Sequence, residues 1–134
     1  MFLLDTNILS EMVRKKPNAK VRNQLIHTSV EDCYSSVISR YELRYGALLR
    51  EDGPLFWKKL QSEILSLPTW LPVSVPVADC AASLAAELER KGQHLDTHDL
   101  LIAATAMEHN LTLITRNTKH FQRVTSLRLE NWFV

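Results

Sequence analysis

Phe2-Leu3-Leu4-Asp5-Thr6-Asn7 sets the architecture, because an apolar run that predicts a buried strand passes directly into polar residues typical of a helix start. Leu111-Thr112-Leu113-Ile114-Thr115 has high β-propensity and predicts a second strand. Just before it, residues 100–107 are apolar on nearly every side, which predicts a central, buried helix. Short strands that alternate with helices indicate a parallel sheet.

The rest of the chain alternates in the same way. Further strands are expected at 32–36, 70–75 and 127–132, and helices at 8–14, 18–27, 39–50, 55–67, 77–91 and 117–122. No linker, repeat or low-complexity tract interrupts this order. We predict one α/β domain over residues 1–134, with a central, mostly parallel sheet of about five strands and helices on both faces.

Composition excludes several classes of protein. With 134 residues, 46% hydrophobic, 23% charged and three glycines, the chain is neither disordered nor collagen-like. Its two cysteines, Cys33 and Cys80, show no metal-ligand or disulfide spacing, so free thiols and a cytoplasmic location are expected. A net charge of +1 gives no general basic field, and no apolar run is long enough for a membrane span.

Polar side chains stand where the predicted strands end or the following helices begin: Asp5, Glu42, Asp99 and Asn117. In a parallel sheet these places meet along the edge formed by the carboxyl ends of the strands. Carboxylates crowded there repel one another, and a divalent cation removes that cost. Ligands that are all oxygen favour Mg²⁺ or Mn²⁺ over zinc.

Each of these residues also has a purely structural interpretation. Asp5 or Asn7 would cap the first helix, and Ser39 with Glu42 fits a capping box. Asp99 is a normal acid near a helix N-terminus, where the helix dipole favours negative charge. Asn117 would cap the helix that starts at Thr118 in the same manner.

Four blocks, in order along the chain, resemble the PIN-domain ribonucleases: MFLLDTN at 1–7, SRYELRYG at 39–46, DLLIAATA at 99–106 and LITRN at 113–117. Their layout is most similar to the VapC-type toxins of bacterial toxin–antitoxin pairs. The resemblance implies a Mg²⁺- or Mn²⁺-dependent endoribonuclease that cleaves cellular RNA of the tRNA or rRNA class through a metal-activated water. It also implies that Asp5 and Asp99 ligate the ion, with Glu42 ligating directly or through water.

Other residues around these blocks have expected supporting roles. The family often has Asp where this chain has Asn117, so we expect Asn117 to hold a weaker or second ion. Asp96 replaces a small residue that is common in the family and is a candidate for a charge just outside the metal ligands. Thr6, Asn7 and Thr115 are expected to position waters or backbone groups.

Cations and aromatic residues suggest contacts with partners. Arg40, Arg44 and Arg116 are candidates for contact with RNA phosphates. Tyr41 and Tyr45, spaced i and i+4, suit packing or a partner surface better than a base-stacking platform.

The resemblance also implies protein partners. A VapB-type antitoxin would lay its tail in a groove that leads to the acids, and DNA would be contacted only indirectly, through that antitoxin. Phe56, Trp57 and Leu60 in the helix expected at 55–67 offer an apolar surface suited to a homodimer.

Other functions fit less well. Phosphatases with an aspartyl nucleophile need a second Asp two residues after the first, where this chain has Asn7. A PIN-type nuclease of RNA processing, outside any toxin–antitoxin pair, stays open. So does a catalytically silent PIN domain that only binds RNA or a partner, although the presence of all three acids argues against it.

Overall fold

The computed structural model describes all 134 residues and has a five-stranded sheet at its centre. The strand order is β3-β2-β1-β4-β5 and every neighbouring pair is parallel, which confirms the predicted fold class. The strands are β1 (Phe2–Leu4), β2 (Cys33–Ser36), β3 (Thr69–Leu71), β4 (Thr112–Ile114) and β5 (Leu129–Glu130).

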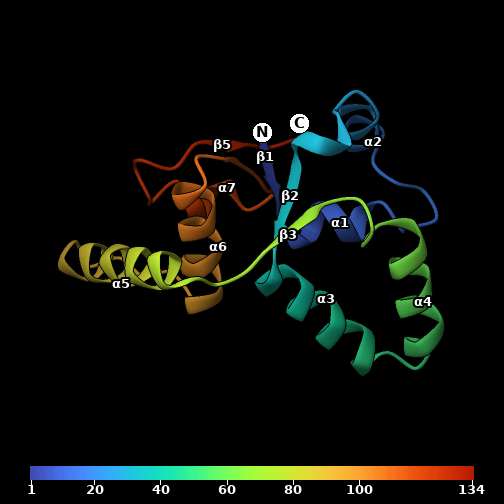
Figure 1. Cartoon of the computed structure of the whole chain (residues 1–134), viewed down its shortest axis with the longest axis horizontal. Helices are drawn as coiled ribbons and strands as arrows, with labels where there is room; N and C mark the ends of the chain where they lie inside the picture. The colour runs from blue at the N-terminus through green and yellow to red at the C-terminus, as the bar shows by residue number, and fades with distance from the viewer.

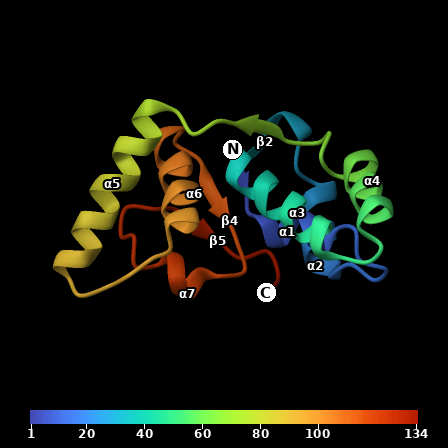
Figure 2. The same cartoon turned by 90° about the horizontal axis from the view of Figure 1, so that it is seen from below.

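Seven α-helices and one 3-10 turn connect the strands. Figures 1 and 2 show α5 and α6 on one side of the sheet, and α1 to α4 on the other. The helices are α1 (Thr6–Glu11), α2 (Ala19–Ile26), α3 (Val37–Leu49), α4 (Gly53–Glu63), α5 (Val75–Arg90), α6 (Thr97–Glu108) and α7 (Thr118–Phe121), and the 3-10 turn is Val30–Asp32. No helix is long and apolar enough to cross a bilayer.

The two central strands supply both halves of the core because successive side chains point to opposite faces of the sheet. Leu3 and Leu113 pack into the cluster formed with α5 and α6. Leu4 and Ile114 pack into the cluster on the other face, with α1 and α4. Burial on both faces holds β1 and β4 firmly in register, so the residues that follow them have fixed positions.

Several helix boundaries differ from the sequence prediction. Helix α3 begins at Val37, where the Ser36 hydroxyl accepts a hydrogen bond from the Ile38 N–H at 3.0 Å, so the capping box predicted for Ser39 and Glu42 was wrong. Asp52-Gly53-Pro54 does not only end a helix, because α4 starts within it. A Cβ on Gly53 would collide with the Ala47 carbonyl oxygen, so glycine is needed where α4 leaves α3.

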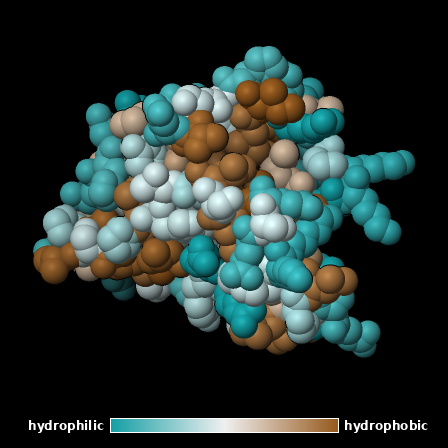
Figure 3. Space-filling view, turned by 45° about the vertical axis from the view of Figure 1, so that its right-hand side comes forward, coloured by the Kyte–Doolittle hydropathy of each residue, from teal (hydrophilic) through white to brown (hydrophobic).

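The apolar surface expected on α4 is mostly absent. Leu60 is fully buried, and Phe56 and Trp57 are half-buried against the core. The large apolar side chains that do reach water here are Leu55 near the start of α4, which was not among the predicted residues, and Leu48 and Leu49 at the end of α3. Figure 3 shows that apolar residues on this face of the molecule form separate patches between hydrophilic ones.

Candidate active site

The candidate site lies between β1 and β4, at the carboxyl ends of the strands. After β1 the chain moves outward through β2 to β3, and it returns to the other side of β1 to form β4 and β5. This change of direction makes a crevice outside the strand ends, which is the usual ligand site of open parallel sheets. Asp5 directly follows β1 and Thr115 directly follows β4.

Hydrogen bonds hold the Asp5 carboxylate in one orientation. The Thr115 hydroxyl donates to Asp5 Oδ2 at 2.7 Å, and the Thr6 backbone N–H donates to Oδ1 at 2.8 Å. The Asn7 side-chain amide donates to Oδ2 at 3.3 Å. Asp5 is thus the N-cap of α1, as the structural interpretation predicted, and it also lies at the base of the crevice.

Burial raises the pKa of Asp5 from 3.8 to about 6. The hydrogen bonds from Thr115 and Thr6 oppose this rise, while the negative charges of Glu42 and Asp99 add to it. Only 4% of Asp5 is exposed, so water screens these charges poorly. The structure therefore brings the three predicted acids close enough to affect one another electrostatically.

Glu42 and Asp99 approach the crevice from two helices. The Thr6 hydroxyl donates to Glu42 Oε1 at 2.8 Å, which links α3 to the end of β1. Asp99, in the first turn of α6, is half-buried and its carboxylate has no hydrogen bond or ion pair within the chain. Burial raises the pKa of Asp99, as do the charges of Glu42 and Asp96.

These side chains fit a hard divalent cation that keeps part of its water shell. No group of three or more His, Cys, Asp or Glu side chains is arranged so that the protein alone could enclose an ion. Mg²⁺ does not need such a cage, because it commonly binds through one or two carboxylates and retains several waters. A bound ion would stabilise two carboxylates most: that of Asp99, which has no partner in the chain, and that of Asp5, whose charged form is disfavoured by burial.

Two further candidates lie at the margin of the site. Asn117 is exposed and occupies the N-cap position of α7, but its side chain makes no capping hydrogen bond. Its backbone N–H donates to the Thr115 hydroxyl at 3.0 Å, so the same hydroxyl connects Asn117 to Asp5. The Asp96 side chain is 82% exposed, and its Oδ1 lies 3.4 Å from His94 Nε2.

The three arginines proposed to bind RNA are not grouped at the acids. Arg40 comes two residues before Glu42, and Arg44 comes two residues after it. Side chains two residues apart point to nearly opposite sides of a helix, so both arginines point away from Glu42. Their guanidinium groups stack on aromatic rings: Arg40 lies 5.2 Å from the Trp70 ring centre and Arg44 lies 4.8 Å from that of Trp57.

Arg116 is nearer to the site. Its backbone N–H donates to Asn7 Oδ1 at 3.2 Å, while its side chain stacks on Phe133 at 4.6 Å.

Sequence reasoning missed His120. Its charge, together with that of His98, lowers the pKa of Asp99 and so partly offsets burial. His120 and Arg123 line a depression of about 180 Å³ next to Asp99, with Leu95 at its wall. The available signal was position, because His120 comes one turn after Asn117, in the short helix that follows β4.

A comparison of this sequence with known families matches the PIN domain over residues 2–127. The chain belongs to the PIN-domain family. Named relatives narrow this to the VapC ribonucleases and related toxins. The chain is 38% identical over 126 residues to "Toxin FitB" of Neisseria gonorrhoeae, covering 90% of this chain and 91% of FitB. It is 34% identical over 133 residues to "Ribonuclease VapC2" of Rickettsia felis, covering 98% of both.

The name of a third relative states its RNA substrate. The "tRNA(fMet)-specific endonuclease VapC" of Shigella flexneri is 32% identical over 131 residues, covering 98% of this chain and 97% of the relative. Together these likenesses make this PIN domain a member of the VapC ribonuclease group of toxin–antitoxin toxins.

Solved structures agree with this assignment. The crystal structure of FitAcB from Neisseria gonorrhoeae has a TM-score of 0.91 and 35% identity, and the match covers 99% of each chain. The structure of VapBC2 from Rickettsia felis, bound to a DNA fragment from their promoter, has a TM-score of 0.88 and 33% identity, with 98% of each chain covered.

Proposed function

We propose that this PIN domain is a Mg²⁺- or Mn²⁺-dependent endoribonuclease that acts as the toxin of a toxin–antitoxin pair. The observation that carries the proposal is the buried Asp5 carboxylate, fixed by Thr115 and Thr6 and repelled by Glu42 and Asp99. A site that accumulates negative charge at the base of a crevice is suited to bind a cation, and through the cation a phosphate.

Each acid has a role that follows from its surroundings. Asp5 and Asp99 supply the ligand oxygens, because one is held rigidly and the other has no partner in the chain. Glu42, oriented by Thr6, acts through a water as an orienting group or a base. When bound, the ion lowers the pKa of a water and offsets the charge of the phosphate under attack. Asn117 adds an uncharged oxygen at the edge of the site.

We propose a structured RNA of the tRNA or rRNA class as substrate. Support comes from the printed name of the Shigella relative, a tRNA endonuclease of nearly the same length. Of the three arginines predicted to bind RNA, Arg116 is the best placed to meet a phosphate, because its backbone is tied to Asn7 beside Asp5.

The experiment is cleavage of purified tRNA and rRNA by the purified protein with Mg²⁺ or Mn²⁺. Asp5→Ala and Asp99→Ala should stay folded and lose nearly all cleavage, and EDTA should stop the wild type. Asp32→Ala is the matched control, since Asp32 precedes β2 at the opposite end of the sheet. Cleavage that persists in EDTA or in either site variant would refute the mechanism. RNA binding without any cleavage would instead favour a silent PIN domain.

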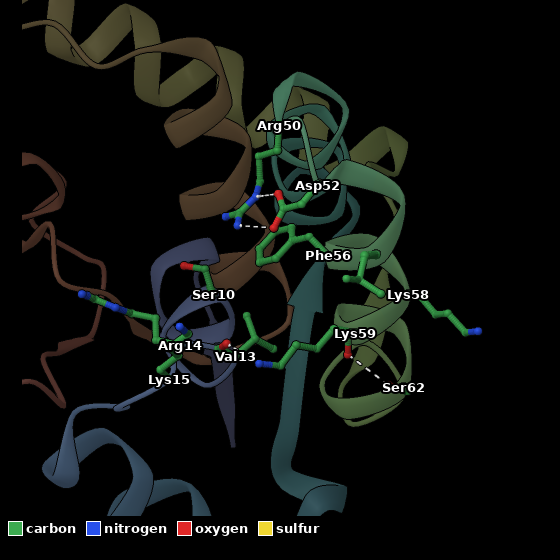
Figure 4. A pocket seen from close by; sticks show the side chains of 11 residues that line it. Ser10, Val13, Arg14, Lys15, Arg50, Asp52, Phe56, Lys58, Lys59 and Ser62 are labelled. Atoms are coloured by element: carbon green, nitrogen blue, oxygen red, sulfur yellow. Dashed lines mark hydrogen bonds and ion pairs between the residues drawn. The ribbon is translucent and has the colours of Figure 1, made fainter.

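We also propose where the antitoxin binds. A groove of about 980 Å³ runs between α1 and α4, and we call it the basic groove. Figure 4 shows residues of α1 and of the segment that follows it on one side, and residues of α4 on the other. Five of its lining residues are basic: Arg14, Lys15, Arg50, Lys58 and Lys59. One is acidic, Asp52, and three are apolar, Val13, Leu55 and Phe56. The groove adjoins the C-terminal end of α1, whose first residue, Thr6, lies beside the acids, so a tail that leaves the groove along α1 would approach the candidate site.

The basic groove suits a peptide with acidic and apolar side chains, whose far end presents a cation to the acids. Co-expression with the neighbouring gene should relieve growth arrest caused by this protein. Lys58→Glu in the groove should weaken that relief, whereas Lys91→Glu at the end of α5 should not. Equal relief for both variants would remove the groove from the interface. The chain's net charge of +1 is consistent with DNA being contacted only through the antitoxin.

A homodimer is proposed on different residues from those expected. Leu48 is 62% exposed and Leu49 is 70% exposed, and both lie at the end of α3. Covering such side chains by a second copy would remove apolar area from water. Light scattering should show a dimer for the wild type and a monomer for a Leu48→Ser, Leu49→Ser variant. A monomeric wild type would refute the dimer.

A further inference from the structure

Three aromatic rings stand in a row beside the acids, and we call them the ring ladder: Tyr45 and Tyr41 of α3, and His98 of α6. The tyrosine rings are nearly parallel, with centres 6.1 Å apart and an angle of 10° between their planes. The His98 ring meets Tyr41 edge-on, at 5.4 Å and 74°. The ladder therefore connects two helices that carry different acids of the site.

The ring ladder is not part of the core. Tyr41 is 53% exposed and Tyr45 54%, and His98 is exposed as well. Neither tyrosine hydroxyl makes a hydrogen bond within the chain, in contrast to the third tyrosine, Tyr34, whose hydroxyl reaches Met1 Sδ at 3.7 Å. Aromatic side chains that stabilise a fold bury most of their surface, so these rings are available for contact with a molecule outside the chain.

The position of the ladder links it to the chemistry. Tyr41 directly precedes Glu42, and His98 directly precedes Asp99. The contact between the Tyr41 and His98 rings, at 5.4 Å, joins the two residues that precede these acids, so the ladder borders the crevice where the phosphate would lie. A molecule held by these rings therefore lies beside the residues that carry the acids.

The charge distribution indicates which part of a nucleic acid fits there. The nearest arginines on α3, Arg40 and Arg44, point away and stack on Trp70 and Trp57. The ring ladder contains no Lys or Arg, so a phosphate there would meet only the two tyrosine hydroxyls and the His98 imidazole, with no permanent positive charge to offset the nearby acids. A base has uncharged faces that stack on Tyr and His rings, and it can approach carboxylates that would repel a free phosphate.

The spacing of Tyr41 and Tyr45 alone favoured packing or a partner surface, but their exposure and their contact with His98 beside the acids change that interpretation. We propose that the ring ladder stacks a base of the RNA substrate next to the phosphodiester that is cleaved. This inference rests on the proposed ribonuclease function and adds a binding surface to it. The exposed part of the Tyr41 ring stacks on the base, and the contacts with Tyr45 and His98 fix the orientation of that ring. The exposed leucines further along α3, Leu48 and Leu49, have no polar edge and belong to the protein interface proposed above.

The test measures RNA binding apart from cleavage. In an Asp5→Asn background, fluorescence anisotropy follows a labelled oligoadenylate of about a dozen nucleotides, and an abasic chain of the same length. Tyr41→Leu should weaken oligoadenylate binding about tenfold, the usual size of one lost base stack. It should leave binding of the abasic chain unchanged, because that chain has no base to stack. Tyr41→Phe should bind as tightly as the parent.

Controls separate the alternatives. Tyr34→Leu removes a tyrosine on β2 and should change neither affinity. Equal binding by Tyr41→Leu and its parent would overturn the proposal, and so would an equal loss on both oligonucleotides. A variant that loses its dimer by light scattering but keeps its RNA affinity would show that the ladder is a protein interface, which also overturns it.

Wild-type cleavage of tRNA is measured in parallel. A wild type that neither binds nor cleaves RNA refutes the ribonuclease function, and the ladder proposal falls with it. A wild type that cleaves, beside a Tyr41→Leu variant that binds normally, refutes the ladder alone.

Discussion

Replacing Asp5 with Asn should stabilise the metal-free protein at neutral pH. Burial raises the pKa of Asp5 from 3.8 to about 6, so the folded state holds this proton more tightly than the unfolded state does. Between pH 3.8 and about pH 6 the folded chain binds more protons than the unfolded chain does, so the free energy of unfolding falls as pH rises. Above about pH 6 the loss of folding stability caused by the buried Asp5 charge is complete. At 1.36 kcal/mol per pKa unit, this loss is about 3 kcal/mol.

Asparagine keeps part of the local bonding. Its Oδ1 can accept from the Thr6 N–H, and its amide can donate to the Thr115 hydroxyl, whose oxygen has lone pairs to accept it. Losing the charged acceptor costs about 1 kcal/mol. We therefore expect Asp5→Asn to be more stable than the wild type by about 2 kcal/mol near neutral pH, and no more stable near pH 4, where Asp5 carries its proton.

The assay is urea denaturation in EDTA, at several values across this pH range, for the wild type and Asp5→Asn. Asp32→Asn, at the other end of the sheet, is the control and should follow the wild type. Added Mg²⁺ should stabilise the wild type near neutral pH and have little effect on Asp5→Asn. The reasoning fails if the two unfolding curves respond equally to pH, or if Asp5→Asn is the less stable protein near neutral pH.

Three further substitutions test other contacts. Thr115→Val removes the 2.7 Å hydrogen bond that lowers the pKa of Asp5, so the acid limb of the pH–rate profile should move upward; an unmoved limb would contradict this. Asn117→Ala should leave the melting temperature unchanged, because the side chain caps nothing, while raising the Mg²⁺ concentration for half-maximal cleavage; the reverse pattern would make Asn117 a structural residue. Arg44→Leu should lower the free energy of unfolding by about 1 kcal/mol through loss of the Trp57 contact, without weakening RNA binding measured by anisotropy.

The sequence was sufficient to predict the sheet and the meeting of the acids. Phe2-Leu3-Leu4 and Thr112-Leu113-Ile114 are short, largely apolar runs that end at polar residues. Runs of this kind are typical of central parallel strands, which are buried on both faces of the sheet. Once β1 and β4 are neighbours, the residues that follow them must share one edge. The proximity of Asp5 to Thr115 follows from that geometry.

The start of α3 and the contacts of its arginines could not be predicted from residue spacing, because both depend on how side chains pack between helices. The start of α3 was misplaced because Ser36 and Ser39 are both good caps, and only tertiary contacts select Ser36. Ser39 is then buried with a hydroxyl that has no partner. Arg40 and Arg44 were assigned to RNA because charge is visible in a sequence. Whether a guanidinium group meets a phosphate or a tryptophan depends on how α3 and α4 pack.

The hydrogen bond between Thr115 and Asp5 joins residues 110 positions apart in the chain. A ribosome adds about 5 to 20 residues per second, so Asp5 is made roughly 5 to 20 s before its partner. During that interval β1 has no β4 to pair with, although it is among the first segments to emerge. The crevice is consequently one of the last parts of the protein to assemble during translation. A nascent or truncated chain that stops before residue 115 lacks the arrangement on which the proposed toxicity depends, so such a chain should be harmless to RNA.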